Sequence, residues 1–206
     1  MDPLSIYSDL KEKIIWLDLK PGSTLQQEEL AAAYRVSRNP ITLALTRLDV
    51  EEWVVRNGSH FVVSPLTIDR IREITEIRSV MEIQANVWAI HRMSADGLAR
   101  LKGLKKEIQK LDENTTNRTI VEIDVRFHQL MYKETKNQQL AAMLDRMLSH
   151  YVRFWLSNPN KIQVTTFFRD AMEIIESIET KDEVRLKAAS TAHIMASLDE
   201  VMGLNR

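Results

Sequence analysis

The sequence predicts a mainly α-helical fold, in which a small N-terminal unit of three helices and a β-hairpin precedes an antiparallel bundle of six helices. Apolar residues recur at helical spacing over most of the 206 residues. A short alternating segment around Asn57-Gly58 is typical of a hairpin. Beyond Pro65 the helical pattern continues with no strand signal. We therefore divide the chain into a first domain, residues 1–66, and a second, residues 67–206.

The composition excludes several classes of protein. Hydrophobic residues make up 44% of the chain, which is enough for a buried core, and 28 basic residues balance 29 acidic ones. The absence of cysteine excludes disulfides, a thiolate nucleophile and Cys-ligated zinc. No apolar run approaches the roughly 20 residues that span a bilayer, and the N-terminus lacks a signal-peptide pattern. We expect a cytoplasmic protein with no membrane partner.

The first domain begins with an amphipathic helix over residues 4–18, which Pro21-Gly22 ends. Two short helices follow, over residues 26–34 and 37–50, joined by a tight turn. Ser37 stands where an N-cap side chain would accept a hydrogen bond from the first helical turn, and Pro40 is tolerated because it lies in that turn. One apolar stripe with i, i+3, i+4, i+7 spacing predicts the buried face of the second short helix: Ile41, Ala44, Leu45 and Leu48.

The opposite face of this helix carries short polar groups and arginines, which suit the major groove of DNA, where base edges are read by such side chains. The alternative is that the two helices are plain core elements. The hairpin at residues 53–63 would be a second contact, with Asn57 also near its tip, or would only cover the core. The residues proposed to face DNA are Arg35, Ser37, Arg38, Asn39, Thr42, Leu43, Thr46, Arg47, Ser59 and His60.

The N-terminal motif resembles a known family. Residues 19–25 (LKPGSTL), 29–31 (ELA) and 36–41 (VSRNPI) are similar to the winged helix-turn-helix of GntR-family transcription regulators. The rest of the chain resembles the all-helical C-terminal domain of the FadR-like branch, known as FCD. The resemblance implies a DNA-binding domain followed by a bundle that binds an effector and forms a homodimer. This chain departs from the family at Thr42-Leu43, where Arg-Glu is usual. Its operator sequence therefore cannot be inferred from the operators of other members.

The second domain is expected to hold six helices and one polar loop at residues 114–117. Their order and short connections predict an antiparallel bundle. The expected helices cover residues 67–92, 95–112, 118–135, 137–156, 162–179 and 182–203.

Asp124 and His128 are four residues apart on a predicted helix, so their side chains share one face. Together with His193 of the last helix they can reach one divalent ion, although such pairs are often only hydrogen-bonded neighbours. The resemblance favours the metal, of zinc or nickel type, because residues 124–128 match a DxxFH segment that supplies ligands in metal-binding members. In the same alignment Ala171 occupies the fourth ligand position, where it cannot coordinate.

Three ligands still suffice if water or an effector carboxylate completes the coordination shell, and His150 is a possible substitute. The competing interpretation is a metal-free cavity in which Asp124, His128 and His193 hydrogen-bond an organic ligand directly. The resemblance also points Arg78 into this cavity, where it would bind a carboxylate. A salt bridge from Arg78 to Glu82 or Asp124 is the structural alternative. Arg153, among aromatic residues, is a second anion-binding residue.

We therefore expect a ligand-responsive transcriptional repressor that binds a pseudopalindromic operator as a homodimer and responds to a small organic acid. Residues 1–66 carry seven basic and nine acidic side chains, a net charge of −2, so binding must depend on local arginines and on dimerisation. The alternative is a metal-dependent enzyme that uses Asp124, His128 and His193 around an activated water. A bundle that only mediates protein association would leave the first domain unexplained.

Overall fold

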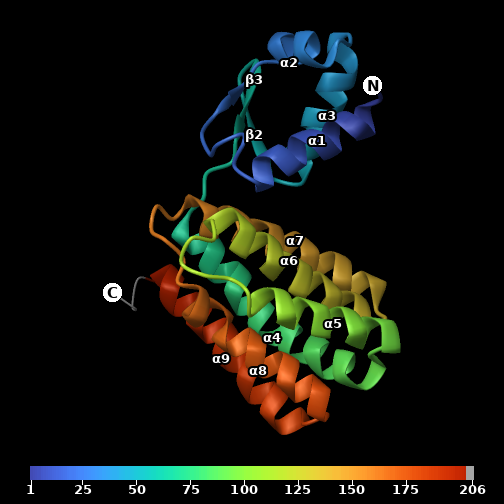
Figure 1. The fold of residues 1–206 in the computed structure, drawn as a ribbon. Helices are drawn as coiled ribbons and strands as arrows, with labels where there is room; N and C mark the ends of the chain where they lie inside the picture. The colour runs from blue at the N-terminus through green and yellow to red at the C-terminus, as the bar shows by residue number, and fades with distance from the viewer. Residues whose placement is uncertain (203–206) are drawn as a thin grey trace. The chain divides into compact units, whose positions relative to one another are not determined.

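The computed structural model describes residues 1–202, with side chains described as far as Ser197 (Figure 1). Contacts between Cα atoms divide the chain into two compact units, of which the first is Met1–Thr67 and the second begins at Ile68. Over the described part of the chain, each helix is too short or too polar to cross a membrane.

The first unit contains three helices and a small antiparallel sheet, as the sequence predicts, with one additional strand. Apolar residues of α1 and α3 pack around Trp53 and Phe61 to form its core, and Ile41, Ala44, Leu45 and Leu48 are all at most 1% exposed. The predicted buried stripe is therefore confirmed. The elements are α1 (Pro3–Ile15), β1 (Thr24–Leu25), α2 (Gln27–Tyr34), α3 (Arg38–Val50), β2 (Val54–Asn57) and β3 (His60–Val63).

Two local predictions in this unit are wrong. Helix α1 ends at Ile15, three residues early, because Leu17 adopts a left-handed conformation with φ of 62°. Ser37 is the N-cap residue of α3, but its side chain makes no capping hydrogen bond. A capping hydroxyl bonds the amide of N2 or N3. Pro40 occupies N3 without an N–H, which leaves Asn39 at N2 as the remaining donor, and Ser37 does not bond it.

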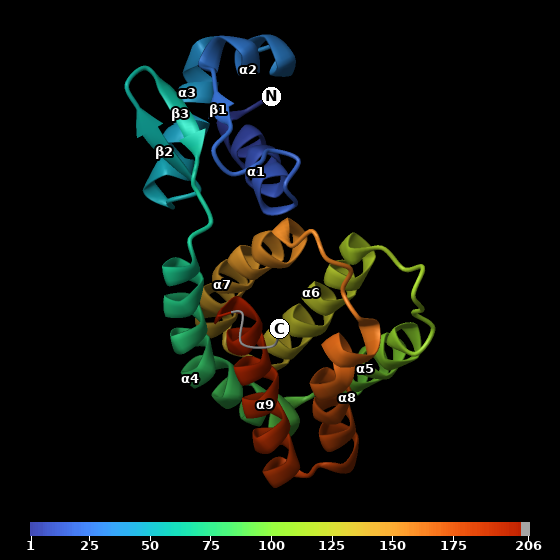
Figure 2. The ribbon, with the colours of Figure 1, turned by 90° about the vertical axis from the view of Figure 1, so that its left-hand side faces the viewer.

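The sheet has the strand order β1-β3-β2, and both pairings are antiparallel (Figure 2). The hairpin closes where Asn57 pairs with His60, and Gly58 in the turn has φ of 60°, a conformation that glycine adopts without strain. Strand β1 was not predicted, since two residues are too few to show alternation. It pairs Thr24 with Val62 and Leu25 with Phe61.

The second unit is the predicted antiparallel six-helix bundle. Helix α4 packs against α6, α7 and α9, and α8 packs against α9. The predicted helix boundaries agree with the structure to within four residues, the largest error being the end of α5. Residue 203, the predicted end of α9, lies outside the described residues. The helices are α4 (Ile68–Arg92), α5 (Ala95–Ile108), α6 (Asn117–Glu134), α7 (Gln138–Ser157), α8 (Val164–Thr180) and α9 (Glu183–Met202).

Ionisable side chains are unusually common in the interior of this bundle. Arg78 and Glu82 of α4, and Asp124 and His128 of α6, are all less than 9% exposed. Because burying a charge is costly unless it is paired, their placement marks the part of the bundle where function should be sought.

Candidate functional site

The outward face of α3 is available to a partner. Arg38, Asn39, Leu43, Thr46 and Arg47 are exposed. Leu43 is 53% exposed, so an apolar side chain is accessible in the middle of this face. Of three further proposed contact residues, Arg35 and Ser37 precede the helix and are exposed, and Thr42, within it, is partly exposed.

Gln27, the first residue of α2, organises the leading edge of this face, and the sequence reasoning missed it. Its amide oxygen accepts hydrogen bonds from Arg38 Nε at 2.9 Å and from Thr42 Oγ1 at 2.8 Å. Gln27 is only 7% exposed. A second α2 side chain, Glu28, pairs with Arg38 Nη1 at 3.0 Å. The Arg38 guanidinium is thus oriented by the neighbouring helix.

The guanidinium of Arg47, toward the other end of α3, is likewise bound to the protein's own side chains. It stacks 4.1 Å from the centroid of the Tyr7 ring and pairs with Glu51 at 3.3 Å. Glu51 also accepts hydrogen bonds from Tyr7 and Lys11. Burial opposes the charge of Glu51, but Lys11 and Tyr7 outweigh it and lower its pKa to about 2.

The hairpin places its proposed contact residues unequally. Ser59 is exposed in the turn, whereas His60 is partly buried and is the first residue of β3, paired with Asn57. Arg56, next to the turn on β2, is exposed and donates a hydrogen bond to the Gly58 carbonyl.

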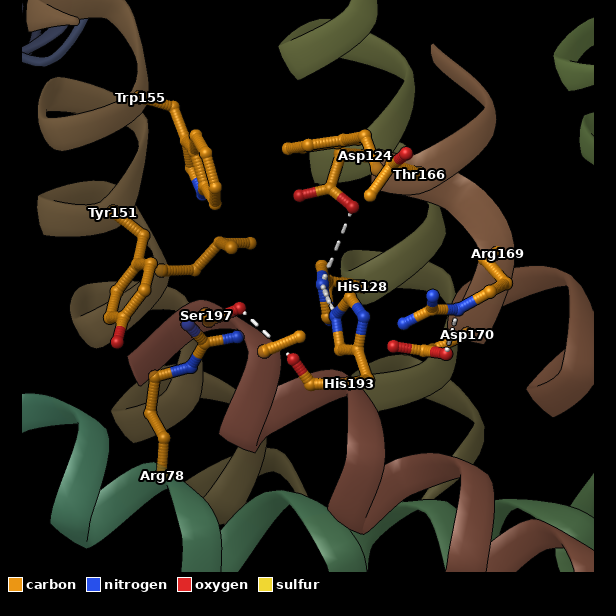
Figure 3. Close-up of a pocket in the computed structure, with 13 residues that line it drawn as sticks. Arg78, Asp124, His128, Tyr151, Trp155, Thr166, Arg169, Asp170, His193 and Ser197 are labelled. Atoms are coloured by element: carbon orange, nitrogen blue, oxygen red, sulfur yellow. Dashed lines mark hydrogen bonds and ion pairs between the residues drawn. The ribbon is translucent and has the colours of Figure 1, made fainter. Parts of the chain in front are cut away.

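The second unit contains a cavity of about 340 Å³ in the interior of the bundle (Figure 3). Helices α4, α6, α7, α8 and α9 all contribute to its wall. Its lining combines aromatic residues of α7 and α8 with polar residues of α4, α6, α8 and α9. The lining residues that bear on the argument are Arg78, Asp124, His128, Trp155, Phe167 and His193.

Asp124, His128 and His193 meet at one side of this cavity, as the spacing predicted. Their ligand atoms all lie within 4.8 Å of one another. His128 Nε2 is 3.2 Å from His193 Nε2 and 3.6 Å from Asp124 Oδ1. Two imidazole nitrogens that share a tetrahedral zinc ion lie about 3.3 Å apart, since each zinc–nitrogen distance is about 2.05 Å. The three residues therefore fit a metal site.

Glu82 lies behind this group, outside the cavity lining. One oxygen, Oε1, is 2.6 Å from His128 Nδ1 and accepts a hydrogen bond from the Tyr132 hydroxyl at 3.0 Å. The other oxygen, Oε2, accepts hydrogen bonds from Arg78 Nε at 2.8 Å and from Arg78 Nη2 at 2.7 Å. Of the two alternatives for the Arg78 ion pair, Glu82 and Asp124, the structure shows the pair with Glu82.

The buried charges shift one another's pKa values. Burial opposes the charge of Glu82, but Arg78 and His128 outweigh it and hold the pKa of Glu82 well below its usual value. Burial likewise opposes a charge on His128, and the carboxylates of Glu82 and Asp124 outweigh it and raise the pKa of His128. Burial and the adjacent His128 lower the pKa of His193 to about 4, so His193 is neutral at neutral pH.

Three residues named from the sequence do not line the cavity. Arg153 and His150 are buried, at 1% and 3% exposed, and neither lines the cavity. Ala171 is fully buried, while its neighbour Asp170 lines the cavity and accepts a hydrogen bond from Arg169 Nε at 3.0 Å. Tryptophan and phenylalanine lining residues were missed, because aromatic residues at helical spacing are more often core.

Comparisons with known proteins agree with both units. A family model described as "Bacterial regulatory proteins, gntR family" matches residues 4–61, and the FCD domain model matches residues 73–196. The HTH-type transcriptional regulator YdhC of Bacillus subtilis is 29% identical over 199 residues, which cover 94% of this chain and 86% of YdhC. The Nta operon transcriptional regulator of Aminobacter aminovorans is 25% identical over 197 residues, 91% of this chain and 88% of that protein.

Among solved structures, E. coli McbR/YncC has the same fold, with a TM-score of 0.84 at 20% identity, covering 99% of this chain and 98% of that one. The FCD match alone spans more than half of the sequence. The chain therefore belongs to the GntR family of bacterial transcriptional regulators, and its C-terminal bundle is an FCD domain.

Proposed function

We propose that this regulator is a repressor that binds a pseudopalindromic operator as a homodimer and is controlled by a small organic acid in the bundle cavity. The observation that carries the proposal is the meeting of Arg78 with the Asp124, His128 and His193 group in one cavity. Residues 1–66 act as the DNA-binding domain, and residues 67–206 bind the effector and form the dimer.

In this proposal α3 lies in the major groove and the β2–β3 hairpin lies next to it. Arg38, Asn39, Thr46 and Leu43 are the groups that reach base edges, and the Leu43 side chain suits a thymine methyl. A two-fold dimer presents two copies of α3 to half-sites about one helical turn apart. Ser37 supports phosphate contact, because its hydroxyl is exposed and makes no cap hydrogen bond.

A divalent ion of zinc or nickel type is part of the proposed effector site. Asp124, His128 and His193 would hold it, and a carboxylate of the effector or water would complete its coordination. The bound ion would supply a fixed positive charge for an organic anion. The pairing of His128 Nδ1 with Glu82 supports this assignment, because metal-ligating histidines typically bond a carboxylate through the other nitrogen.

The aromatic wall formed by Tyr151, Trp155 and Phe167 supports an effector whose body is apolar or flat, while Arg78 and the metal group support a carboxylate at one end. An effector changes DNA affinity only by its differential affinity for the DNA-competent state. A metal-dependent enzyme is not supported, because the family and the named relatives are transcriptional regulators.

The test combines operator selection with ligand screening on the full chain. Random duplex DNA would be selected on the immobilised protein, and the enriched sequences measured by gel shift. We expect an inverted repeat with half-sites about one turn apart. A panel of small carboxylic acids would then be screened by thermal shift with and without added Zn²⁺. No enrichment of an inverted repeat would contradict the operator proposal, and no thermal shift would contradict the effector proposal.

A further inference from the structure

The strongest unassigned feature in the described part of the chain is the carboxylate of Glu82. We propose that Glu82 is a positioning residue that holds both ligand-facing groups of the cavity, Arg78 through one oxygen and His128 through the other. This inference rests on the proposed role of the cavity and names the residue that sets its geometry.

The two carboxylate oxygens of Glu82 bind different partners. Oε2 accepts hydrogen bonds from Nε and Nη2 of Arg78, at 2.8 Å and 2.7 Å, whereas Oε1 lies 2.6 Å from His128 Nδ1. Glu82 is 1% exposed and does not line the cavity, while Arg78 and His128 both do. A single buried group therefore supports two cavity residues that come from different helices, α4 and α6.

Glu82 also determines which nitrogen of the His128 ring carries the hydrogen. With its Nδ1–H donated to Glu82, the neutral ring carries its lone pair on Nε2, which is the nitrogen that faces His193 and Asp124. The opposite tautomer would point a hydrogen at the place where a ligand or ion is expected. Glu82 thus selects the form of His128 that can coordinate a metal.

Arg78 is held in place by two groups. Glu82 binds one edge of its guanidinium, and the Tyr151 ring packs against the guanidinium carbon, 4.2 Å from the ring centroid. The Tyr151 hydroxyl is in turn hydrogen-bonded to Thr75. A guanidinium held in this way loses little freedom when an anion arrives, so the anion-binding side of the cavity is preorganised.

The test uses five full-length proteins: wild type, R78M, E82M, the double variant R78M/E82M and a control, Y132F. Methionine is used because glutamine would keep an oxygen that can accept from His128 Nδ1–H. E82M alone leaves Arg78 buried without its carboxylate and is expected to destabilise the fold, whereas the double variant removes both charges together. The variant Y132F is the matched control, because it removes a second hydrogen bond to Oε1 and keeps the carboxylate. Circular dichroism and thermal unfolding establish which variants fold.

The first readout is the tautomer of His128 in metal-free protein, from long-range ¹H–¹⁵N NMR correlations at alkaline pH. We expect Nδ1–H in wild type, R78M and Y132F, and a mixture of tautomers in the two E82M proteins. The second readout is Zn²⁺ affinity, measured by competition with a chromophoric chelator. We expect R78M/E82M to bind Zn²⁺ about 10- to 100-fold more weakly than R78M.

An unchanged tautomer in the E82M proteins overturns the proposal. So does Zn²⁺ affinity that agrees within twofold between R78M and R78M/E82M. If wild type binds no Zn²⁺ at all, the metal part of the proposed function fails, and the tautomer measurement alone then decides the role of Glu82.

Discussion

Arg38→Ala is the perturbation that most directly tests how this regulator reads DNA. Arg38 is the first residue of α3, its side chain is 59% exposed, and its guanidinium is oriented by Gln27 and Glu28. An arginine that contacts a base contributes about 1–3 kcal/mol. Since a homodimer would present two copies, the variant should lose about 2–6 kcal/mol of operator binding, or roughly 30-fold to 10⁴-fold in affinity.

The assay is fluorescence anisotropy with a duplex carrying the selected operator, at fixed salt, with a scrambled duplex as reference. Arg72→Ala is the matched control, because Arg72 is an arginine of the second unit that pairs on the surface with Glu76. Its removal should leave DNA affinity unchanged. Thermal unfolding should show both variants folded, since exposed ion pairs contribute at most about 1 kcal/mol.

The salt dependence distinguishes base reading from phosphate contact. If Arg38 contacts only phosphate, Arg38→Ala should weaken operator and scrambled DNA equally and reduce the salt slope by about one. If Arg38 reads a base, the loss should be confined to the operator. Operator affinity within twofold of wild type would refute the assignment of α3 as the reading helix.

Three further predictions concern other parts of the chain. Gln27→Leu should weaken operator binding by about 1 kcal/mol, since Arg38 and Thr42 each lose a hydrogen bond to it; anisotropy measures this, and an affinity equal to wild type would contradict it. His193→Ala should leave less than one equivalent of Zn²⁺ after dialysis, as measured by elemental analysis, whereas wild type should retain one; equal retention would exclude His193 as a ligand. The N-terminal unit should lose stability in acid, because the folded-state pKa of Glu51 is about 2, whereas its ordinary value is 4.5. The contribution of Glu51 is full above pH 4.5 and is lost as the pH falls from 4.5 toward 2. The shift alone corresponds to about 3 kcal/mol, which partial exposure reduces to about 1–2 kcal/mol. Glu51→Gln should remove this pH dependence in urea unfolding, and an unchanged profile would contradict it.

The helices were predictable from the sequence because their apolar spacing is strong and local. The buried stripe of α3 and the hairpin around Gly58 both depend on neighbouring residues only. Strand β1 was missed because a two-residue strand has no measurable periodicity, and it exists only through its pairing with β3. The end of α1 was misjudged because Leu17 adopts a left-handed conformation, and such a conformation is predictable from the sequence mainly where a glycine occupies the position.

Ser37 shows how a correct position can carry a wrong interaction. The N-cap assignment was right, yet the expected side-chain hydrogen bond is absent. Pro40 at N3 has no amide to donate, which removes one of the two usual donors and leaves only Asn39 at N2. Ser37 is therefore exposed, without a cap hydrogen bond, at the face proposed to meet DNA.

Arg78 shows why the cavity could not be derived from the sequence alone. Arg78 and Glu82 are four residues apart on one helix, which predicts an ion pair between them. The resemblance to the family predicts instead that Arg78 faces a ligand, so the two interpretations looked like alternatives. The structure contains both, because Arg78 lines the cavity while its inner edge is bound to Glu82. The deciding contact is the second oxygen of Glu82, which lies against His128, 46 residues further along the chain. Local spacing identifies the members of such a group, but only the packing of α4 on α6 joins the arginine and the histidine through one carboxylate.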